Sequence, residues 1–105
     1  MANIMQMMAK AQKLKSKMAE MQERVRAMDL DGQAGNGMVT CRMSGKFELK
    51  QLKINPSATA DVEMLEDLVI AAVNDARLKA EKMMSDETQK LMSELGLPPG
   101  LDLPF

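Results

Sequence analysis

The stretch from Met7 to Met28, "MMAKAQKLKSKMAEMQERVRAM", decides how this chain can fold. Together with Ile4, its apolar residues are spaced alternately by three and four positions, a heptad pattern kept over four repeats. This apolar seam consists of Ile4, Met7, Ala11, Leu14, Met18, Met21, Val25 and Met28. The pattern predicts a helix of about 27 residues, roughly 40 Å long. Such a helix is too long to be buried in one 105-residue domain, so we expect it to project or to pack against another long helix.

After Met28 the pattern becomes that of a small antiparallel sheet. The segment "MVTCRM" alternates, which predicts a strand with Val39, Cys41 and Met43 on one face. It follows the turn-forming run "GNG", which we interpret as a turn rather than a phosphate-binding loop because no helix follows it. A further strand over residues 30–34 would complete a sheet of three strands.

The connection to the last strand is predicted as a two-residue hairpin turn at Ser44-Gly45. In the segment "KFELKQLKIN" that follows, Phe47 and Leu49 are expected to face inward. The alternation then slips by one position at Gln51, which predicts a bulge or twist there.

A second helical region follows, with Thr59 or Asp61 as its cap and a possible joint at residues 85–89. Gly96 and the two prolines after Leu97 end it. The predicted fold class is α+β, with a long N-terminal helix, a three-stranded antiparallel sheet and a long C-terminal helix in one domain, 1–105. Its parts are a helical arm (1–28), the sheet (29–55), the second helical region (59–95) and a Pro/Gly tail (96–105).

Composition excludes several functions. The chain has no His and a single cysteine, Cys41, so the usual transition-metal sites and Ser-His or Cys-His nucleophiles cannot form. With no Trp or Tyr, it has no platform on which bases could stack. No apolar run approaches the ~18 residues of a membrane helix, and the first ten residues do not resemble a signal peptide. We therefore expect a cytoplasmic protein that is not an enzyme and uses no metal, small-molecule substrate or membrane.

Charge is distributed unevenly along the chain. The net charge is −1, but residues 1–28 sum to +4, residues 29–60 to +1 and residues 61–105 to −6. Within the first helix Lys10, Lys17 and Arg24 recur every seven residues and form a ridge. Such a ridge suits a row of phosphates, although a solvated helix face would carry similar charges. Lys15 flanks the seam on its other side, and Lys13 and Arg26 lie further round the same helix; all three are further candidate contacts to phosphates. The only acids of this helix are Glu20 and Glu23.

Five segments together resemble the YbaB/EbfC family of bacterial nucleoid-associated proteins. They are "AQKLKSKMAEMQE" (11–23), "GNGMV" (35–39), "KINPS" (53–57), "EMLEDLVIAAVNDA" (63–76) and "LPPGLDLPF" (97–105). The resemblance implies a tweezer-like homodimer that binds double-stranded DNA in the nucleoid with low sequence specificity and without a cofactor. The contacts that it implies on the arm are Lys10, Lys13, Lys17 and Arg24, with Arg77, Lys79 and Lys82 on the second helix as weaker candidates.

Two positions depart from the family pattern. Thr40 and Asp102 stand where relatives usually carry Lys, so both changes remove positive charge. The acidity of the chain and its methionine-rich seam also leave an alternative open. The protein could be a helical protein-protein adaptor or a chaperone-like clamp.

Overall fold

The computed structural model describes residues 2–96 of the chain. Its elements are α1 (Ala2–Ala27), β1 (Asp29–Ala34), β2 (Val39–Ser44), β3 (Leu49–Ile54), the short 3-10 helix η1 (Pro56–Ala60) and α2 (Val62–Glu94). The predicted α+β class is confirmed, as is the order of one long helix, a three-stranded antiparallel sheet and a second long helix. The tail beyond residue 96 lies outside the described residues.

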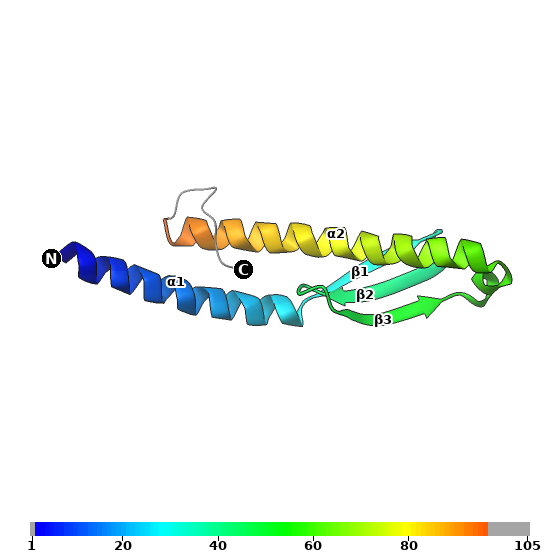
Figure 1. Ribbon diagram of the computed structural model, residues 1–105, viewed down its shortest axis with the longest axis horizontal. Coiled ribbons are helices and arrows are strands. Elements are labelled where there is room, and N and C mark those ends of the chain that lie inside the picture. The colour runs from blue at the N-terminus through cyan, green and yellow to red at the C-terminus, as the bar shows by residue number, and fades with distance from the viewer. Residues whose placement is uncertain (1, 97–105) are drawn as a thin grey trace.

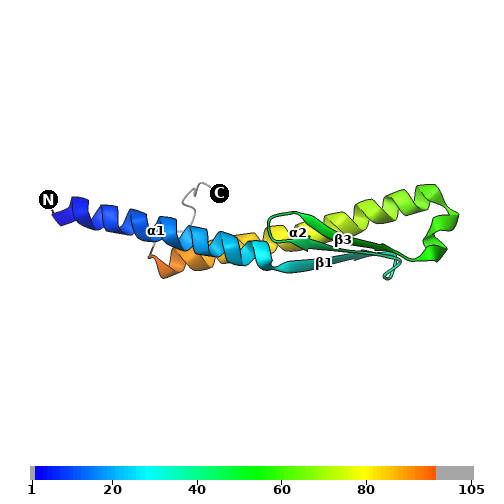
Figure 2. The same ribbon diagram turned by 90° about the horizontal axis from the view of Figure 1, so that it is seen from below.

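The molecule is elongated, with extents of 71 × 22 × 16 Å. Its radius of gyration is 19.1 Å, against about 13 Å for a compact domain of this size. Helix α2 runs along most of the elongated molecule. The sheet lies along the N-terminal half of α2, and α1 runs antiparallel to its C-terminal half (Figures 1 and 2). The N-terminal end of α1 projects past the end of α2.

One hydrophobic core lies between the sheet and α2. Its buried residues are Val39, Cys41, Met43, Ala72, Ala76 and Ala80. The three strand residues share one face, as their alternation predicts, and the alanines recur every four residues on one side of α2. The Cys41 thiol is buried and donates to the Ala72 carbonyl oxygen at 3.3 Å. Burial raises the pKa of this thiol, which makes it a packing group rather than a reactive one.

Strand β1 approaches α2 so closely that only glycine fits at position 32. A Cβ atom added to Gly32 would lie 2.2 Å from the Ala72 carbonyl oxygen and 2.7 Å from the Ala76 amide nitrogen. Both are backbone atoms, which cannot move aside as a flexible side chain can. The small residues therefore set the distance between the sheet and the helix.

A second core holds α1 against α2. Met21, Val25 and Leu91 are buried in it, with Leu14, Met18, Met83, Met84 and Leu95 at its border. The seam of α1 is thus buried only in its C-terminal half. Ile4 and Met7 belong to the same seam but are 60% and 68% exposed, because α2 ends at Glu94. The C-terminal half of α1 therefore packs against α2, and its N-terminal end projects past α2.

The base of α1 is tied to the sheet. The Val25 carbonyl oxygen, near the end of α1, accepts from the Met28 N–H at 3.1 Å and also from the Gly45 N–H at 3.2 Å. A side chain at position 45 would collide with Val25 and Met83. The loop after β2 therefore fixes where the arm begins.

The predicted two-residue turn at Ser44-Gly45 is wrong. Strands β2 and β3 are joined by residues 45–48, and the Ser44 N–H donates to the Glu48 carbonyl oxygen at 2.8 Å. The buried Ser44 hydroxyl accepts from the N–H groups of Lys46 and Glu48, which stabilises the longer loop. Phe47 lies in this loop in a left-handed conformation (φ 68°) and is half exposed, so its predicted inward position is also wrong.

The predicted bulge occurs one residue earlier than expected. Arg42 pairs with Gln51 and Met43 pairs with Leu49, so Lys50 is the extra residue of β3. The register puts Leu49 on the side of the buried Met43, yet Leu49 is half exposed. The reason is that α2 packs on β1 and β2 and leaves β3 uncovered.

Helix α2 runs without interruption through residues 85–89, so no joint exists there. Its cap is Asp61, which accepts from the Met64 N–H at 3.1 Å. Thr59 instead donates its hydroxyl to the Pro56 carbonyl oxygen within η1. Of the helices in residues 2–96, none has a stretch both long enough and apolar enough to span a bilayer.

Replacing Gly32 with Ala is expected to destabilise the protein by about 1–3 kcal/mol, because the added methyl overlaps the α2 backbone. Urea unfolding followed by circular dichroism measures the change. The neighbouring variant Gln33→Ala, which removes only an exposed side chain, should stay within about 0.5 kcal/mol of wild type. An unchanged midpoint for Gly32→Ala would contradict the close approach.

Candidate nucleic-acid interface

The nine basic residues predicted to contact DNA differ in whether they form an ion pair within the chain. Five form ion pairs within the chain: Lys17–Glu20 (3.7 Å), Arg24–Glu87 (2.6 Å), Arg26–Glu23 (3.1 Å), Arg77–Glu81 (3.3 Å) and Lys79–Asp75 (3.3 Å). The other four make no ion pair with any described residue: Lys10, Lys13, Lys15 and Lys82. The structure thus separates cations that are already compensated from those that are not.

Arg24 joins the two long helices. Its Nη2 atom donates to Glu87 Oε2 at 2.6 Å, and the Glu87 side chain is only 15% exposed while that of Arg24 is 53% exposed. A short, partly shielded pair of this kind is held more firmly than a fully exposed one. It braces the arm against α2, directly beside the buried seam. Sequence reasoning missed Glu87, which lies 63 positions away from Arg24.

Around this pair the surface is close to neutral. The groove beside Arg24 is lined by three basic and three acidic side chains together with two apolar ones. They are Lys17, Arg24, Lys90, Glu20, Glu87, Glu94, Met21 and Leu91. The inner half of the Lys10-Lys17-Arg24 ridge therefore faces acids of α2.

The outer half of α1 is different. Lys10, Lys13 and Lys15 are exposed, and the first acid of the chain is Glu20. Lys17 pairs with Glu20 only at 3.7 Å, and both side chains are well exposed, so this pair is weak and open to competition. Among the described residues, basic side chains without an ion pair are thus concentrated at residues 10–15 of α1, around the point where α2 ends.

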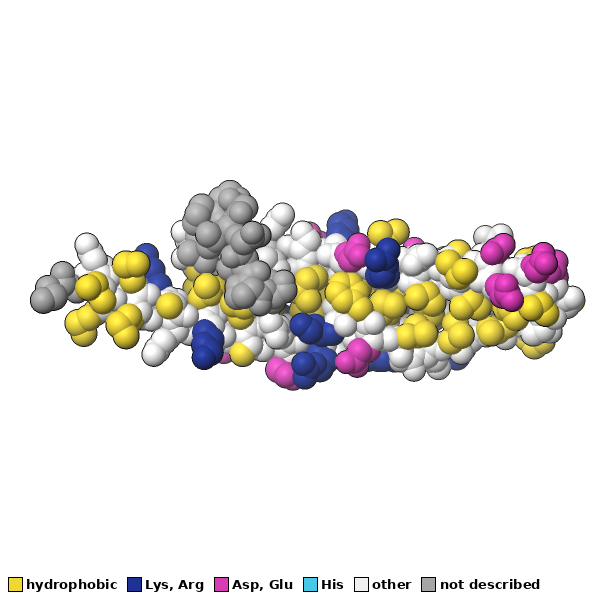
Figure 3. All heavy atoms as spheres, viewed as in Figure 1, with side chains coloured by type: hydrophobic (Ala, Val, Ile, Leu, Met, Phe, Trp, Pro, Cys, Tyr) yellow, Lys and Arg dark blue, Asp and Glu magenta, His cyan; other side chains and the backbone are white. Residues whose placement is uncertain are grey.

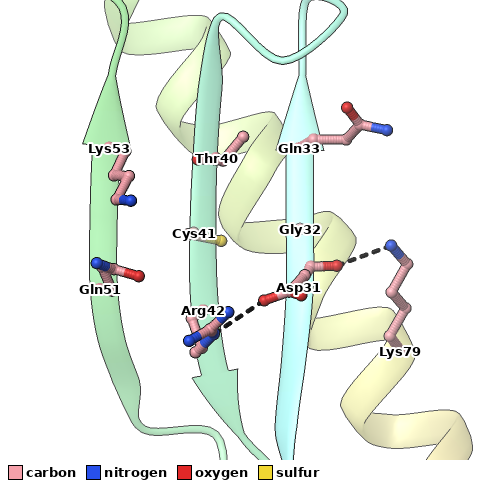
Figure 4. A pocket seen from close by; sticks show the side chains of 9 residues that line it. All are labelled: Asp31, Gly32, Gln33, Thr40, Cys41, Arg42, Gln51, Lys53 and Lys79. Atoms are coloured by element: carbon pink, nitrogen blue, oxygen red, sulfur yellow. Dashed lines mark hydrogen bonds and ion pairs between the residues drawn. The ribbon is translucent and has the colours of Figure 1, made fainter.

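On the second helix, Arg77 and Lys79 are engaged by carboxylates one turn away. Lys79 also reaches over the edge of β1 and donates to the Asp31 carbonyl oxygen at 2.7 Å (Figure 4). Lys82, with no ion pair among the described residues, is separated along the chain from the three lysines of the outer arm.

The face of the sheet away from α2 carries polar side chains around a shallow depression of about 330 Å³. Arg42 there donates to Asp31 Oδ1 at 3.1 Å (Figure 4). Thr40 lies opposite Lys53 of β3, so a Lys at position 40 would place two ammonium groups side by side. This chain lacks that second charge.

Asp75 connects α2 to the edge of the sheet. Its carboxylate accepts the Gln33 backbone N–H at 3.0 Å and pairs with Lys79. The hydrogen bond from Gln33, aided by Lys79, lowers the pKa of the Asp75 carboxyl below its ordinary value. Lys79 therefore has a structural partner that holds it at the sheet edge.

Within residues 2–96 no group of three or more Cys, Asp or Glu side chains is placed to hold a metal ion. The one feature of this surface with a clear chemical preference is the outer arm, whose ammonium groups suit an extended polyanion.

Residues 1–95 match the sequence profile of the YbaB/EbfC DNA-binding family. The chain belongs to this family. Relatives that carry the name nucleoid-associated protein include proteins of Rhizobium meliloti, with 45% identity, and Rhodospirillum rubrum, with 43% identity. Both alignments cover 100% of this chain and 100% of the relative.

The fold of this chain is also found among solved structures. The crystal structure of an uncharacterized protein from Helicobacter pylori superposes with a TM-score of 0.74 at 22% identity, over 78% of this chain and 88% of the other. That likeness concerns the fold alone. The family match and the names of the relatives are what support DNA as a partner and the nucleoid as a location.

The charge of Asp75 is expected to stabilise this YbaB/EbfC protein in a pH-dependent way. Since its folded pKa is lowered, ionised Asp75 stabilises the fold at pH values above the unfolded pKa of about 3.9. The contribution is lost as the pH falls through the folded pKa. Asp75→Asn, which keeps an acceptor oxygen, should therefore lower the unfolding midpoint at pH 7 and have progressively less effect below about pH 4.

Urea unfolding at a series of pH values measures this difference. Asp86→Asn is the control, because it removes an exposed carboxylate of α2 that has no ion pair among the described residues. A pH-independent difference between wild type and Asp75→Asn would contradict a role for the charge.

Proposed function

We propose that this protein binds double-stranded DNA as a homodimer, gripping the phosphate backbone with the outer halves of its two α1 arms and with low sequence specificity. The observation that carries the proposal is the cluster of Lys10, Lys13 and Lys15 on the outer half of α1, none of which forms an ion pair with a described residue. The match to a DNA-binding family supports the choice of partner.

The chemistry of the cluster favours contacts to phosphate over contacts to bases. Lysine ammonium groups are flexible point charges, whereas base readout commonly uses the planar groups of Arg, Asn or Gln. The two arginines of α1, Arg24 and Arg26, are both engaged by carboxylates. Contacts to phosphates position a protein on DNA without reading its sequence, which supports low specificity.

Dimerisation is supported by apolar surface that one chain leaves uncovered. The inner side of β3 carries Leu52 and Ile54, which pair with the buried Cys41 and Val39 but are themselves exposed. A strand whose helix-facing side is apolar and lacks its helix is the typical place for a second subunit.

Helix α2 continues this uncovered surface. Val62 and Ile70 are 64% and 59% exposed, and together with Ile54 they line an open apolar depression. Figure 3 shows hydrophobic side chains along this end of the molecule, over the sheet and α2. A second copy would cover β3 and the exposed side of α2 while the distant α1 arms stay free.

The ion pairs within the chain refine which basic residues are proposed to contact DNA. Lys17 joins the proposed surface through its weak pair, while Arg24 is proposed to brace the arm. DNA contacts by Arg26, Arg77, Lys79 and Lys82 stay predictions. The family match favours DNA over the protein adaptor that composition alone left open.

Duplex binding should depend steeply on salt. Two arms with three free lysines each give about six phosphate contacts, so a plot of log affinity against log salt should have a slope near −5. Fluorescence anisotropy with labelled duplexes of unrelated sequence measures the slope. A slope near zero, or no binding at low salt, would contradict the proposal.

The variant Lys10→Gln/Lys13→Gln/Lys15→Gln should flatten this slope and weaken all duplexes at least tenfold at low salt. The matched control Lys46→Gln/Lys50→Gln/Lys53→Gln removes the same charge from the sheet region. It should retain most of the affinity. Equal loss in both variants would show that total charge, rather than the outer arm, drives binding.

Replacing Ile54 with Asp should convert the dimer to a monomer, because it places a charge in the proposed apolar interface. Light scattering after size exclusion should then give one chain mass of 11.6 kDa, against twice that value for wild type. Met5→Asp, which alters an equally apolar but remote position on the arm, should stay dimeric. A monomeric wild type would refute the dimer.

A further inference from the structure

The seam of α1 continues beyond the helix that covers it. Met21 and Val25 are fully buried against α2, whereas Ile4 and Met7, on the same face, have no partner among the described residues. Figure 3 shows hydrophobic side chains gathered at this end of the molecule. Four large apolar residues are exposed within residues 4–8, which is costly for a surface that stays in water. They are Ile4, Met5, Met7 and Met8.

A mostly apolar groove of about 280 Å³ begins where α2 ends. Its floor is formed by Ala11 and Leu14 of α1 and by Leu95, and its rim carries Lys10, Lys13 and Glu94. The groove is continuous with the packed core, since Leu14 and Leu95 also border Met21 and Leu91. It leads from the last described residues toward the uncovered seam.

The chain itself supplies a segment that matches this surface. Residues 97–105, "LPPGLDLPF", contain apolar Leu97, Leu101, Leu103 and Phe105, and Asp102 is their only charge. Only Leu95 and Gly96 separate them from the end of α2. Because α1 and α2 are antiparallel, the end of α2 lies beside the outer half of α1. Leu14 and Ile4 are about 15 Å apart along the helix. Nine extended residues span up to about 30 Å, so the segment can reach.

We propose that residues 97–105 dock on the uncovered half of the α1 seam of their own chain, where their apolar side chains cover Ile4, Met7 and Ala11. Asp102 would lie near Lys10 and Lys13. These two lysines and Glu94 give the groove rim a net positive charge, which would attract the Asp102 carboxylate. The docked segment would extend the helix-helix interface by burying apolar area that α2 is too short to reach. It would also put a carboxylate beside the lysines of the proposed DNA surface. Only this last consequence rests on the proposed function.

Cysteine cross-linking in the full chain tests the docking directly. Ala11→Cys with Leu101→Cys should form a disulfide within one chain under mild oxidation, at least fivefold more than Gln12→Cys with Leu101→Cys. Position 12 is one residue away but about 100° around the helix. Native Cys41 is buried and stays apart from the reaction. Peptide mapping after non-reducing electrophoresis identifies the pair; cross-links equal to the control, or formed mainly between chains, would overturn the proposal.

Hydrogen exchange gives a second readout that needs no DNA. In the variant Leu101→Ser/Leu103→Ser/Phe105→Ser, amides of residues 4–14 should exchange at least threefold faster than in wild type. Residues 18–27, which α2 covers, should be unchanged and serve as the internal control. Unchanged exchange in residues 4–14 would overturn the docking even if DNA binding proves correct, and docking would stand if DNA binding fails.

Discussion

The packing of half of the α1 seam against α2 is the contact on which the rest of the molecule depends. Met21 and Val25 are buried against Leu91, and Gly45 ties the end of α1 to the loop after β2. Because α2 ends at Glu94, this contact stops midway along α1. The same helix is therefore anchored at one end and free at the other, which creates both a projecting arm and an uncovered stretch of seam.

This arrangement explains how an acidic protein can present a positive surface. Where α1 lies beside α2, Arg24 and Lys17 meet the carboxylates of Glu87 and Glu20, and the field of each cation is largely cancelled nearby. Farther out on α1, Lys10, Lys13 and Lys15 form no ion pair with any described residue. Net charge is a poor guide here because screening in salt limits the reach of each charge to about 10 Å. In the proposed function, DNA meets the local field of the arm rather than the net charge of the chain.

The two uncovered apolar regions have a common origin. Helix α2 is wide enough to cover β1 and β2 but not β3, and long enough to cover half of α1 but not all of it. Each shortfall leaves apolar side chains on the edge of an existing core rather than scattered over the surface. Apolar area at a core edge is most readily buried by chain that extends the same core. A second subunit can do so at β3, and the residues after Gly96 can do so at α1.

Local pattern determined the elements of this protein. The heptad spacing predicted α1, the alternation of Val39, Cys41 and Met43 predicted β2, and the uneven distribution of charge predicted a basic arm. Contacts between distant residues were decided only by the tertiary structure. The Ser44 hydroxyl lengthened a loop that looked like a tight turn, and the antiparallel register of the helices brought Glu87 to Arg24. The physical reason is the distance along the sequence. The periodicity of a segment reports which of its own faces is apolar. Which residue pairs with a charge, and which helix covers a strand, depend on where other elements of the fold begin and end.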